Sequence, residues 1–159
     1  MVTAPVLDKT NNKKEDGGAF VSDYLAYLLA HASHLVSGQF HDHLRKRGIA
    51  IPTWRVLAIL SDGDGMTIGE VARISLYNQP TATKIVERLT EEGLLERRRD
   101  GEDRRKTLVF ITPKGRDLVA DLLMDAKDYE TRITESYSDA EVKVLKDVLR
   151  TLISRMELP

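Results

Sequence analysis

The chain has 159 residues, of which 42% are apolar and 31% are charged, and its formal net charge at pH 7 is −1. This composition fits a single globular domain with a modest core that a partner subunit could complete. No apolar run approaches the roughly 20 residues of a membrane span, and the N-terminus is too polar for a secretion signal, so we expect a cytoplasmic protein with no membrane partner. Because the sequence lacks cysteine, disulfides, thiolate metal ligands and cysteine-based redox sensing are excluded.

The charges are unevenly distributed along the chain. Residues 97–116 contain eight Lys or Arg against three acids, a net charge of +5, whereas residues 117–159 contain six basic against ten acidic side chains, a net charge of −4. An anionic polymer responds to the local field rather than to the sum of all charges. The basic stretch therefore favours a nucleic-acid partner although the whole chain is slightly acidic.

The N-terminal part of the chain is predicted to be a tail followed by helices. Residues 1–18 carry few apolar groups and are expected to form a mobile tail. Apolar residues at helical spacing predict a helix over 20–47. A second helix is expected to begin at Pro52 and to end in the Asp-Gly repeat at 62–65.

Two short helices are expected next. Thr67-Ile68-Gly69-Glu70 has the spacing of a capping box and predicts a third helix after it. A fourth helix begins near Asn78 or Gln79, has Pro80 in its first turn and ends at Gly93.

The periodicity then changes from helical to extended. Residues 94–99 and 107–112 are rich in apolar or β-branched side chains and predict two antiparallel strands joined by an exposed loop, DGEDRR. Thr112-Pro113 supplies a cap and a first-turn proline for a long fifth helix. Ser138-Asp139-Ala140-Glu141 is a second capping box, and the helix after it carries a wide apolar stripe.

This order of elements predicts a mainly α fold with a small β-hairpin wing, that is, a winged helix-turn-helix. We expect one domain over 19–159, with the DNA-binding lobe at 52–112 and long dimerisation helices at 19–47 and 113–157. The terminal helices have more apolar surface than the small lobe can cover. Because helix-turn-helix proteins commonly read two half-sites, a homodimer is the economical way to bury that surface.

The second helix of a helix-turn-helix places its N-terminal residues against base edges in the major groove. The candidate contacts there are Asn78, Gln79, Pro80, Thr81, Thr83 and Lys84. Their amide and hydroxyl groups can bond to bases or phosphates, and the Ala82 methyl could meet a thymine methyl. The alternative is that Asn78 only caps the helix and the threonines only face solvent.

The hairpin tip concentrates arginine on a slender loop, and the candidate DNA contacts there are Arg99, Arg104 and Arg105. An arginine on such a loop can enter a narrow minor groove, where the negative potential is deepest. A carboxylate in the loop can pair with one guanidinium and fix its direction, so Asp103 is predicted to be an orienting group. The alternative is a solvated charged face.

The segment from Trp54 to Arg116 resembles the MarR family of bacterial transcription regulators. The most specific part is the D-x-R element at the wing tip, Asp103-Arg104-Arg105, followed by a strand and by T-x-K-G at Thr112, Lys114 and Gly115. With the flanking helices, the resemblance spans roughly Phe20 to the C-terminus. The chain departs from it at Ser75-Leu76-Tyr77, where many members have a glycine.

The resemblance implies a homodimeric repressor of a neighbouring operon that binds a pseudopalindromic operator on double-stranded DNA. It also implies release by a small, often aromatic or phenolic, anion. Carried over by position, Pro80, Thr81, Thr83 and Lys84 fall on the recognition helix, Arg105 on the minor-groove wing position and Asp103 on its orienting partner. Such a protein would be associated with the nucleoid when bound to DNA.

Effectors of the family tend to bind between the dimerisation helices and the DNA-binding lobe. The candidates for such a site are His31, His34, His41, Trp54 and Arg55. They offer an aromatic face, a cation for a carboxylate and imidazoles for hydrogen bonds. The alternatives are that Trp54 belongs to the core, that Arg55 is a surface residue and that the histidines are ordinary helix residues.

Three other functions would use some of the same residues. The histidines at 31, 34 and 41 share one helix face, so a metal-responsive regulator is an alternative if another helix supplied a ligand. A winged-helix interaction module without inducer response is a second alternative. An enzyme is not expected, because Asp23 or Asp42 beside the histidines is accompanied by no nucleophile motif, phosphate loop or carboxylate pair. We expect neither a cofactor nor a bound metal.

Overall fold

The computed structural model describes residues 19–103 and 105–157, so the predicted tail at 1–18 lies outside the described residues. The elements in chain order are α1 (Ala19–Asp23), α2 (Leu25–Lys46), α3 (Ile51–Asp62), β1 (Met66–Thr67), α4 (Ile68–Ser75), α5 (Gln79–Glu91), β2 (Leu95–Arg99), β3 (Thr107–Ile111), α6 (Pro113–Thr134) and α7 (Asp139–Met156). The chain divides into two units, one ending at Ser37 and the other beginning at Gly38. None of the helices in the described part of the chain has the length and apolar character of a membrane span.

The predicted helix starts are confirmed by their capping bonds. The Thr67 hydroxyl accepts the Glu70 N–H at 3.2 Å, and the Glu70 carboxylate accepts the Thr67 N–H at 2.8 Å, which completes the capping box of α4. Ser138 and Glu141 make the same reciprocal pair at the start of α7. These bonds satisfy amide groups that no helical carbonyl can reach.

The single helix predicted over 20–47 is wrong in one detail, because it is interrupted at Tyr24. The Tyr24 N–H bonds to the Val21 carbonyl, three residues back, at 3.4 Å. This tighter 3₁₀-type spacing ends α1, and α2 starts one residue later.

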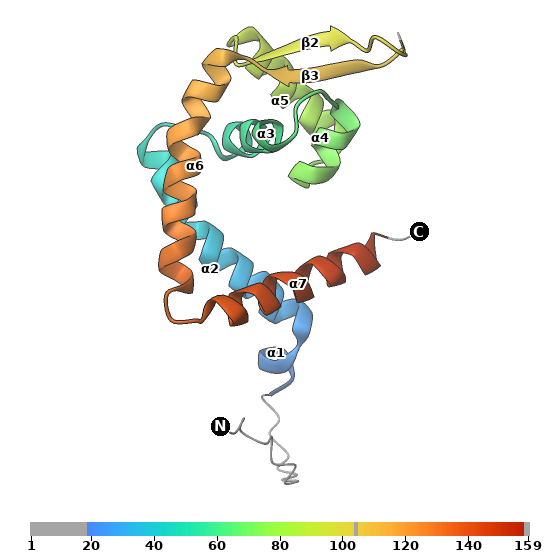
Figure 1. Cartoon of the computed structure of the whole chain (residues 1–159). Helices are drawn as coiled ribbons and strands as arrows, with labels where there is room; N and C mark the ends of the chain where they lie inside the picture. Colours follow the sequence, from blue (N-terminus) through green and yellow to red (C-terminus); the bar gives the residue numbers. More distant parts are fainter. Residues whose placement is uncertain (1–18, 104, 158–159) are drawn as a thin grey trace. The chain divides into compact units, whose positions relative to one another are not determined.

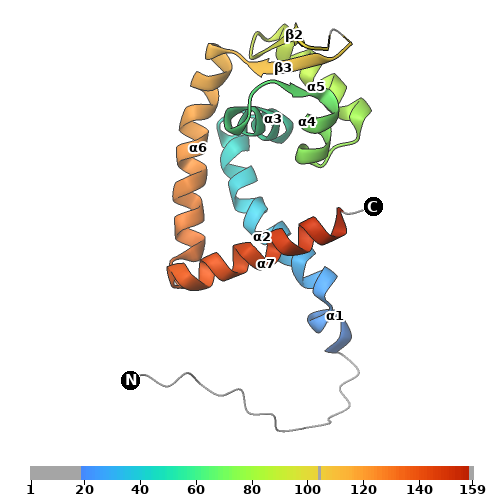
Figure 2. The same ribbon diagram turned by 45° about the vertical axis from the view of Figure 1, so that its right-hand side comes forward.

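The wing is a three-stranded antiparallel sheet in the order β1-β3-β2. The hairpin is confirmed, with Leu95 opposite Ile111 at its base and Arg99 opposite Thr107 near its tip. The short strand β1 was not predicted, since Met66 and Thr67 are too few residues to show an alternating pattern. Figures 1 and 2 show β2 and β3 lying over α5, with α6 running alongside α3.

The main core lies in the lobe that was predicted over residues 52–112, and it joins α3, α4, α5, the sheet and the start of α6. Its fully buried members are Val56, Leu57, Leu60, Val71, Val86, Leu89 and Val109. A second cluster of Phe40, Leu44 and Leu122 joins the C-terminal part of α2 to α6, and Trp54 packs against both clusters. The mainly helical winged fold that the sequence predicted is therefore confirmed.

The turn between α4 and α5 holds an unusual backbone conformation at Leu76. Its φ is 60°, and it is the one residue other than glycine with a positive φ in the described part of the chain. The Tyr77 N–H bonds to the Ala72 carbonyl at 3.0 Å and closes the end of α4. Leu76 thus occupies the left-handed position for which glycine is favoured.

Gly115 allows the first turn of α6 to approach the end of α5. A Cβ at this position would overlap the Leu94 carbonyl oxygen and would lie 2.8 Å from Cγ1 of Ile111. Because the carbonyl belongs to the backbone, it cannot move aside as a flexible side chain would.

We expect Gly115→Ala to lower the free energy of unfolding by about 1–3 kcal/mol, the usual cost of overpacking. Denaturant unfolding followed by circular dichroism measures this change. Gly38→Ala is the matched control, because a Cβ on Gly38 has no neighbour within 4 Å. Equal stability of the two variants would contradict the close approach at Gly115.

Candidate nucleic-acid interface

The start of α5 is fixed by Asn78, whose side-chain oxygen accepts the Thr81 N–H at 2.9 Å. Asn78 therefore has the capping role that the sequence left open as an alternative. Pro80 lies in the first turn, where its missing N–H costs no hydrogen bond. Asn78, Gln79, Pro80 and Thr81 are all exposed.

The two faces of α5 have different surroundings. Ala82, Ile85, Val86 and Leu89 are buried, and Ala82 has no exposed surface. The expectation that the Ala82 methyl could meet a thymine is therefore wrong, because the methyl packs inside the lobe. The half-buried Thr83 donates its hydroxyl to the Gln79 carbonyl at 2.8 Å, whereas Lys84 is exposed. Gln79, Thr81 and Lys84 form the outward polar face of the helix.

The far end of α5 is held by side chains from α3, from α6 and from Thr112, the residue that caps α6. Lys114 donates to the Glu92 carbonyl at 2.7 Å, and the Thr112 hydroxyl donates to the Gly93 carbonyl at 2.8 Å. Arg88 donates to the hydroxyl of the buried Thr53 at 2.9 Å. A cation at a helix C-terminus is favourable, because the last carbonyls carry partial negative charge. Lys114 thus stabilises the end of α5, and its ammonium group is not free to bind an outside anion.

Backbone and carboxylate bonds shape the wing loop. The Asp100 N–H bonds to the Lys106 carbonyl at 3.0 Å, and the Lys106 N–H bonds to the Asp103 carbonyl at 2.8 Å. The Asp103 carboxylate accepts the backbone N–H of Arg105 at 3.0 Å. The pairing of Asp103 with a guanidinium stays a prediction for Arg104, which lies outside the described residues. The bond that Asp103 makes to the Arg105 N–H holds the loop backbone at that residue.

The arginines of β2 and its loop differ in their partners. Arg97 lies 3.7 Å from the Glu87 carboxylate, and Arg98 pairs with Glu96 and lies 4.7 Å from the centre of the Phe110 ring. Arg99 and Arg105 are exposed, and neither guanidinium has an ion pair within the described part of the chain. Arg104 lies outside the described residues. The side chains available to an outside anion are therefore those nearest the tip.

The predicted effector residues lie in different surroundings. His31 and His34 are exposed and belong to the unit that ends at Ser37, where His31 contacts the Tyr27 ring. Burial, together with the nearby charges of Arg55 and Arg45, lowers the pKa of His41. His41 is therefore more readily neutral than an ordinary histidine at a given pH.

The Trp54 ring is half-buried and lies 5.2 Å from the Phe40 ring, so Trp54 serves the core. Arg55 lies over the Tyr77 ring at 5.6 Å. Within residues 19–103 and 105–157, no group of three His, Cys, Asp or Glu side chains could hold a metal ion.

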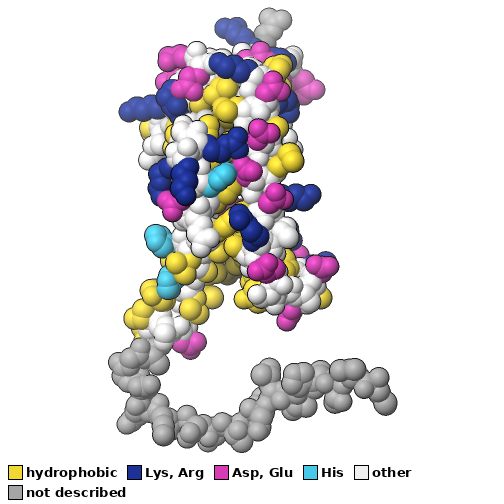
Figure 3. Space-filling model, turned by 90° about the vertical axis from the view of Figure 1, so that its left-hand side faces the viewer, with side chains coloured by type: hydrophobic (Ala, Val, Ile, Leu, Met, Phe, Trp, Pro, Cys, Tyr) yellow, Lys and Arg dark blue, Asp and Glu magenta, His cyan; other side chains and the backbone are white. Residues whose placement is uncertain are grey.

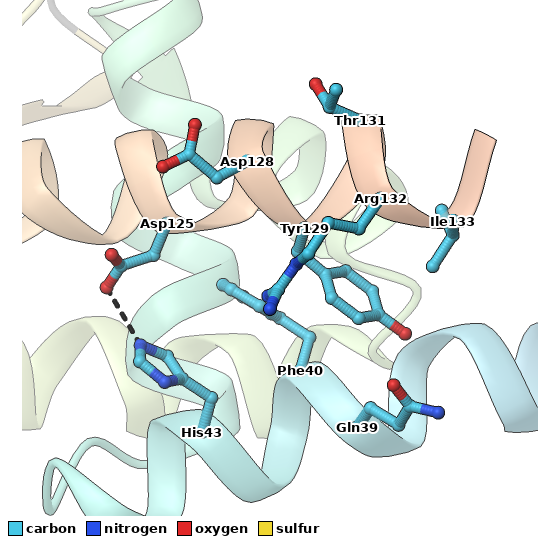
Figure 4. Close-up of a pocket in the computed structure, with 9 residues that line it drawn as sticks. All are labelled: Gln39, Phe40, His43, Asp125, Asp128, Tyr129, Thr131, Arg132 and Ile133. Carbon is cyan, nitrogen blue, oxygen red and sulfur yellow. Dashed lines mark hydrogen bonds and ion pairs between the residues drawn. The ribbon is translucent and has the colours of Figure 1, made fainter. Parts of the chain in front are cut away.

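A cavity of about 680 Å³ lies between the C-terminal part of α2 and α6 (Figure 4). It is lined by Gln39, Phe40, His43, Asp125, Asp128, Tyr129, Thr131, Arg132 and Ile133. None of the predicted effector residues belongs to this lining set. Figure 3 looks at the molecule from the side on which α6 lies in Figure 1, and basic and acidic side chains are interspersed there.

The cavity combines aromatic rings with charged groups. The Phe40 and Tyr129 ring centres are 5.9 Å apart, and the Arg132 guanidinium lies 5.8 Å from the Tyr129 ring centre. His43 bonds to the Asp125 carboxylate at 2.8 Å, and Arg47 bonds to the same oxygen at 2.6 Å. The His43 bond is the main cause of the lowered pKa of Asp125, and Arg47 adds to it.

The sequence contained only a weak signal for this set of residues. Phe40, Asp125, Tyr129 and Arg132 belong to helices that were read as dimerisation surface, and nothing in either helix shows which positions face the other. His43 is one of four histidines within residues 31–43, but its partner Asp125 is 82 positions away in the chain. Helical spacing alone therefore could not select it.

The model of the MarR family matches residues 47–106 of the chain. A MarR family transcriptional regulator from Silicibacter pomeroyi DSS-3 is 42% identical, with a TM-score of 0.77, over 87% of this chain and 98% of that one. The transcriptional repressor IacR of Pseudomonas putida is 28% identical over 85% of this chain and 81% of its own length.

BpsR of Bordetella bronchiseptica, whose structure concerns the regulation of its DNA binding by 6-hydroxynicotinic acid, is 27% identical. It has a TM-score of 0.71 and is matched over 82% of this chain and 94% of its own. The predicted family is thus confirmed by sequence identity and by fold over most of the chain. The chain belongs to the MarR family of transcriptional regulators.

Proposed function

We propose that this regulator binds a pseudopalindromic DNA operator as a homodimer and represses a neighbouring operon until a small aromatic or phenolic anion releases it. The observation that carries the proposal is that one lobe presents two elements able to contact DNA, helix α5 and the wing. The outward face of α5 carries Thr81 and Lys84, and the wing beside it carries Arg99 and Arg105 without ion pairs in the described part of the chain.

The two elements have complementary roles in this proposal. Thr81, near the start of α5, contacts a base edge in the major groove, and Lys84, one turn later, contacts a phosphate. The N–H of Gln79 can bind a second phosphate, because Pro80 has no N–H and the amides of Thr81 and Ala82 are bonded to Asn78. Arg105 enters the minor groove and Arg99 approaches its rim, while Asp103 holds the loop. We assign Arg104 to the same wing contact from its place in the sequence.

Arg105→Ala should weaken operator binding about tenfold and reduce the slope of log affinity against log salt by about one, because one fewer counterion is released. Fluorescence anisotropy with the upstream DNA of the gene, titrated at several salt concentrations, measures both values. The control is Arg150→Ala, which removes an exposed arginine paired with Asp147 on α7. If Arg105→Ala binds like the parent at every salt concentration, the wing does not contact DNA.

The dimer proposal is supported by the apolar face of α7. This helix has no buried residue, and Val144, Leu145, Val148, Ile153 and Met156 are each more than half exposed. A contiguous apolar stripe of this kind is costly in water. A second copy of the chain would cover it and would also set the spacing of two recognition helices on a symmetric operator.

Val148→Asp should shift the protein from dimer to monomer, because a carboxylate would be buried without a partner. Sedimentation equilibrium measures the mass, and operator affinity should fall in parallel. Ser154→Asp, on the polar side of the same helix, serves as the control and should remain a dimer. A dimeric Val148→Asp variant with full operator affinity would argue against this interface.

The effector proposal places an aromatic acid in the cavity between α2 and α6. Its ring would lie against Phe40 and Tyr129, and its carboxylate would pair with Arg132, which has no ion pair within the described residues. BpsR, with its hydroxylated aromatic acid, supports this class of ligand. The secondary candidates for effector contacts are His31, His34, His41, Trp54 and Arg55. Of these, Trp54 contacts Phe40 of the cavity wall.

Hydroxylated aromatic carboxylates should raise the melting temperature of the protein, and a ligand at 100 times its Kd stabilises the folded form by about 2.7 kcal/mol. The compounds that do so should also release the operator in a gel-shift assay. Arg132→Gln should abolish the thermal shift, whereas Lys127→Gln, an exposed change on the same helix, should retain it. Equal shifts in both variants would place the site elsewhere.

A further inference from the structure

Asp64, in the turn between α3 and β1, is bonded to two other elements of the lobe. One carboxylate oxygen accepts the N–H of Ile111 at 3.0 Å and the N–H of Gly65 at 3.2 Å. The other oxygen pairs with the Arg116 guanidinium. A single side chain thus connects the last residue of β3 to the first turn of α6.

The same turn of α6 also holds the end of the recognition helix. Lys114 bonds to the Glu92 carbonyl, and Arg116, two residues on, pairs with Asp64. The first turn of α6 is therefore connected to both α5 and the wing. Lys114 bonds to the end of α5, and Arg116 pairs with Asp64, which bonds to the end of β3. The pair between Asp64 and Arg116 lies on the wing side of this connection.

The wing is long enough to amplify a change at its base. Ile111 pairs with Leu95 at the base, and Thr107, four residues before Ile111 in β3, pairs with Arg99 towards the tip. Four residues of strand span about 13 Å, so a rotation of about 10° at the base moves the tip by roughly 2 Å. A displacement of that size is enough to break a hydrogen bond at Arg105, since such bonds span only about 2.7–3.2 Å.

We propose that Asp64 and Arg116 are positioning residues that set the angle of the wing relative to α5, so that Arg105 reaches the minor groove while Thr81 and Lys84 occupy the major groove. This inference rests on the proposed operator binding. It assigns to Arg116 a role inside the protein, although Arg116 belongs to the basic stretch that favours nucleic acid. Neither residue touches DNA in this proposal.

The test is a double-mutant cycle on operator affinity between Asp64 and Arg105. Asp64→Asn keeps an oxygen acceptor for the Ile111 N–H but removes the ion pair, and should weaken binding about threefold. In the Arg105→Ala background the same change should have almost no effect on operator affinity, because the arginine side chain that Asp64 positions is already absent. Asp62→Asn removes an equal charge two residues away from an exposed position and should leave affinity unchanged.

Arg116→Gln should reproduce the threefold loss and, unlike Arg105→Ala, should leave the salt slope of binding unchanged. Melting temperatures of all variants, measured without DNA, show whether each is folded at the assay temperature. Equal effects of Asp64→Asn in the two backgrounds, or no effect at all, would overturn the positioning role. A reduced salt slope for Arg116→Gln would identify Arg116 as a direct phosphate contact and would also overturn it. Failure of Arg105→Ala to weaken binding would instead overturn the proposed wing contact.

Discussion

The lobe depends on the close approach between the first turn of α6 and the junction of α5 with β2. That approach requires residue 115 to have no side chain, because the Leu94 carbonyl occupies the space of a Cβ. Once the two backbones are in contact, Thr112 and Lys114 can reach the carbonyls at the end of α5. The T-x-K-G element is therefore explained by contacts inside the lobe and not by contacts with DNA.

The dense positive charge of the sequence is divided between two uses. Lys114 and Arg116 stabilise the base of the wing, and Arg97 and Arg98 have acidic partners along β2. The guanidinium groups of Arg99 and Arg105 are left to face solvent. Because only a few side chains near the wing tip are unpaired, the positive potential is more localised than the net charge of +5 over residues 97–116 suggests. The net charge of −4 over residues 117–159 disfavours nonspecific binding to nucleic acid.

Interactions between residues close together in the chain were predictable from the sequence, and interactions between distant residues were not. The capping boxes at Thr67 and Ser138 involve residues three apart, so a short window contains the whole interaction. By contrast, the bond from Ile111 to Asp64 joins residues 47 apart, and β1 exists only because it pairs with β3.

The errors at the site have the same origin. Ala82 was read as exposed because the first turn of α5 looks polar as a whole, and tertiary packing decides which of its residues face inward. The loop position of Asp103 has a similar local explanation, since its carboxylate accepts the backbone N–H of Arg105 two residues on. The candidate DNA contacts were predicted from motif order, whereas the cavity between α2 and α6 depends on two helices whose mutual contacts no short sequence pattern reveals.

The left-handed residue at the turn of the helix-turn-helix has a consequence for how rigidly the two helices are joined. A leucine in this conformation costs about 1–2 kcal/mol relative to its preferred backbone, and its side chain, 84% exposed, recovers little through packing. The bend must then be imposed from both sides, by the closed end of α4 and by the buried face of α5. The angle between α4 and α5 is therefore maintained by packing on both sides of the turn and not by the backbone preference of the turn residue itself.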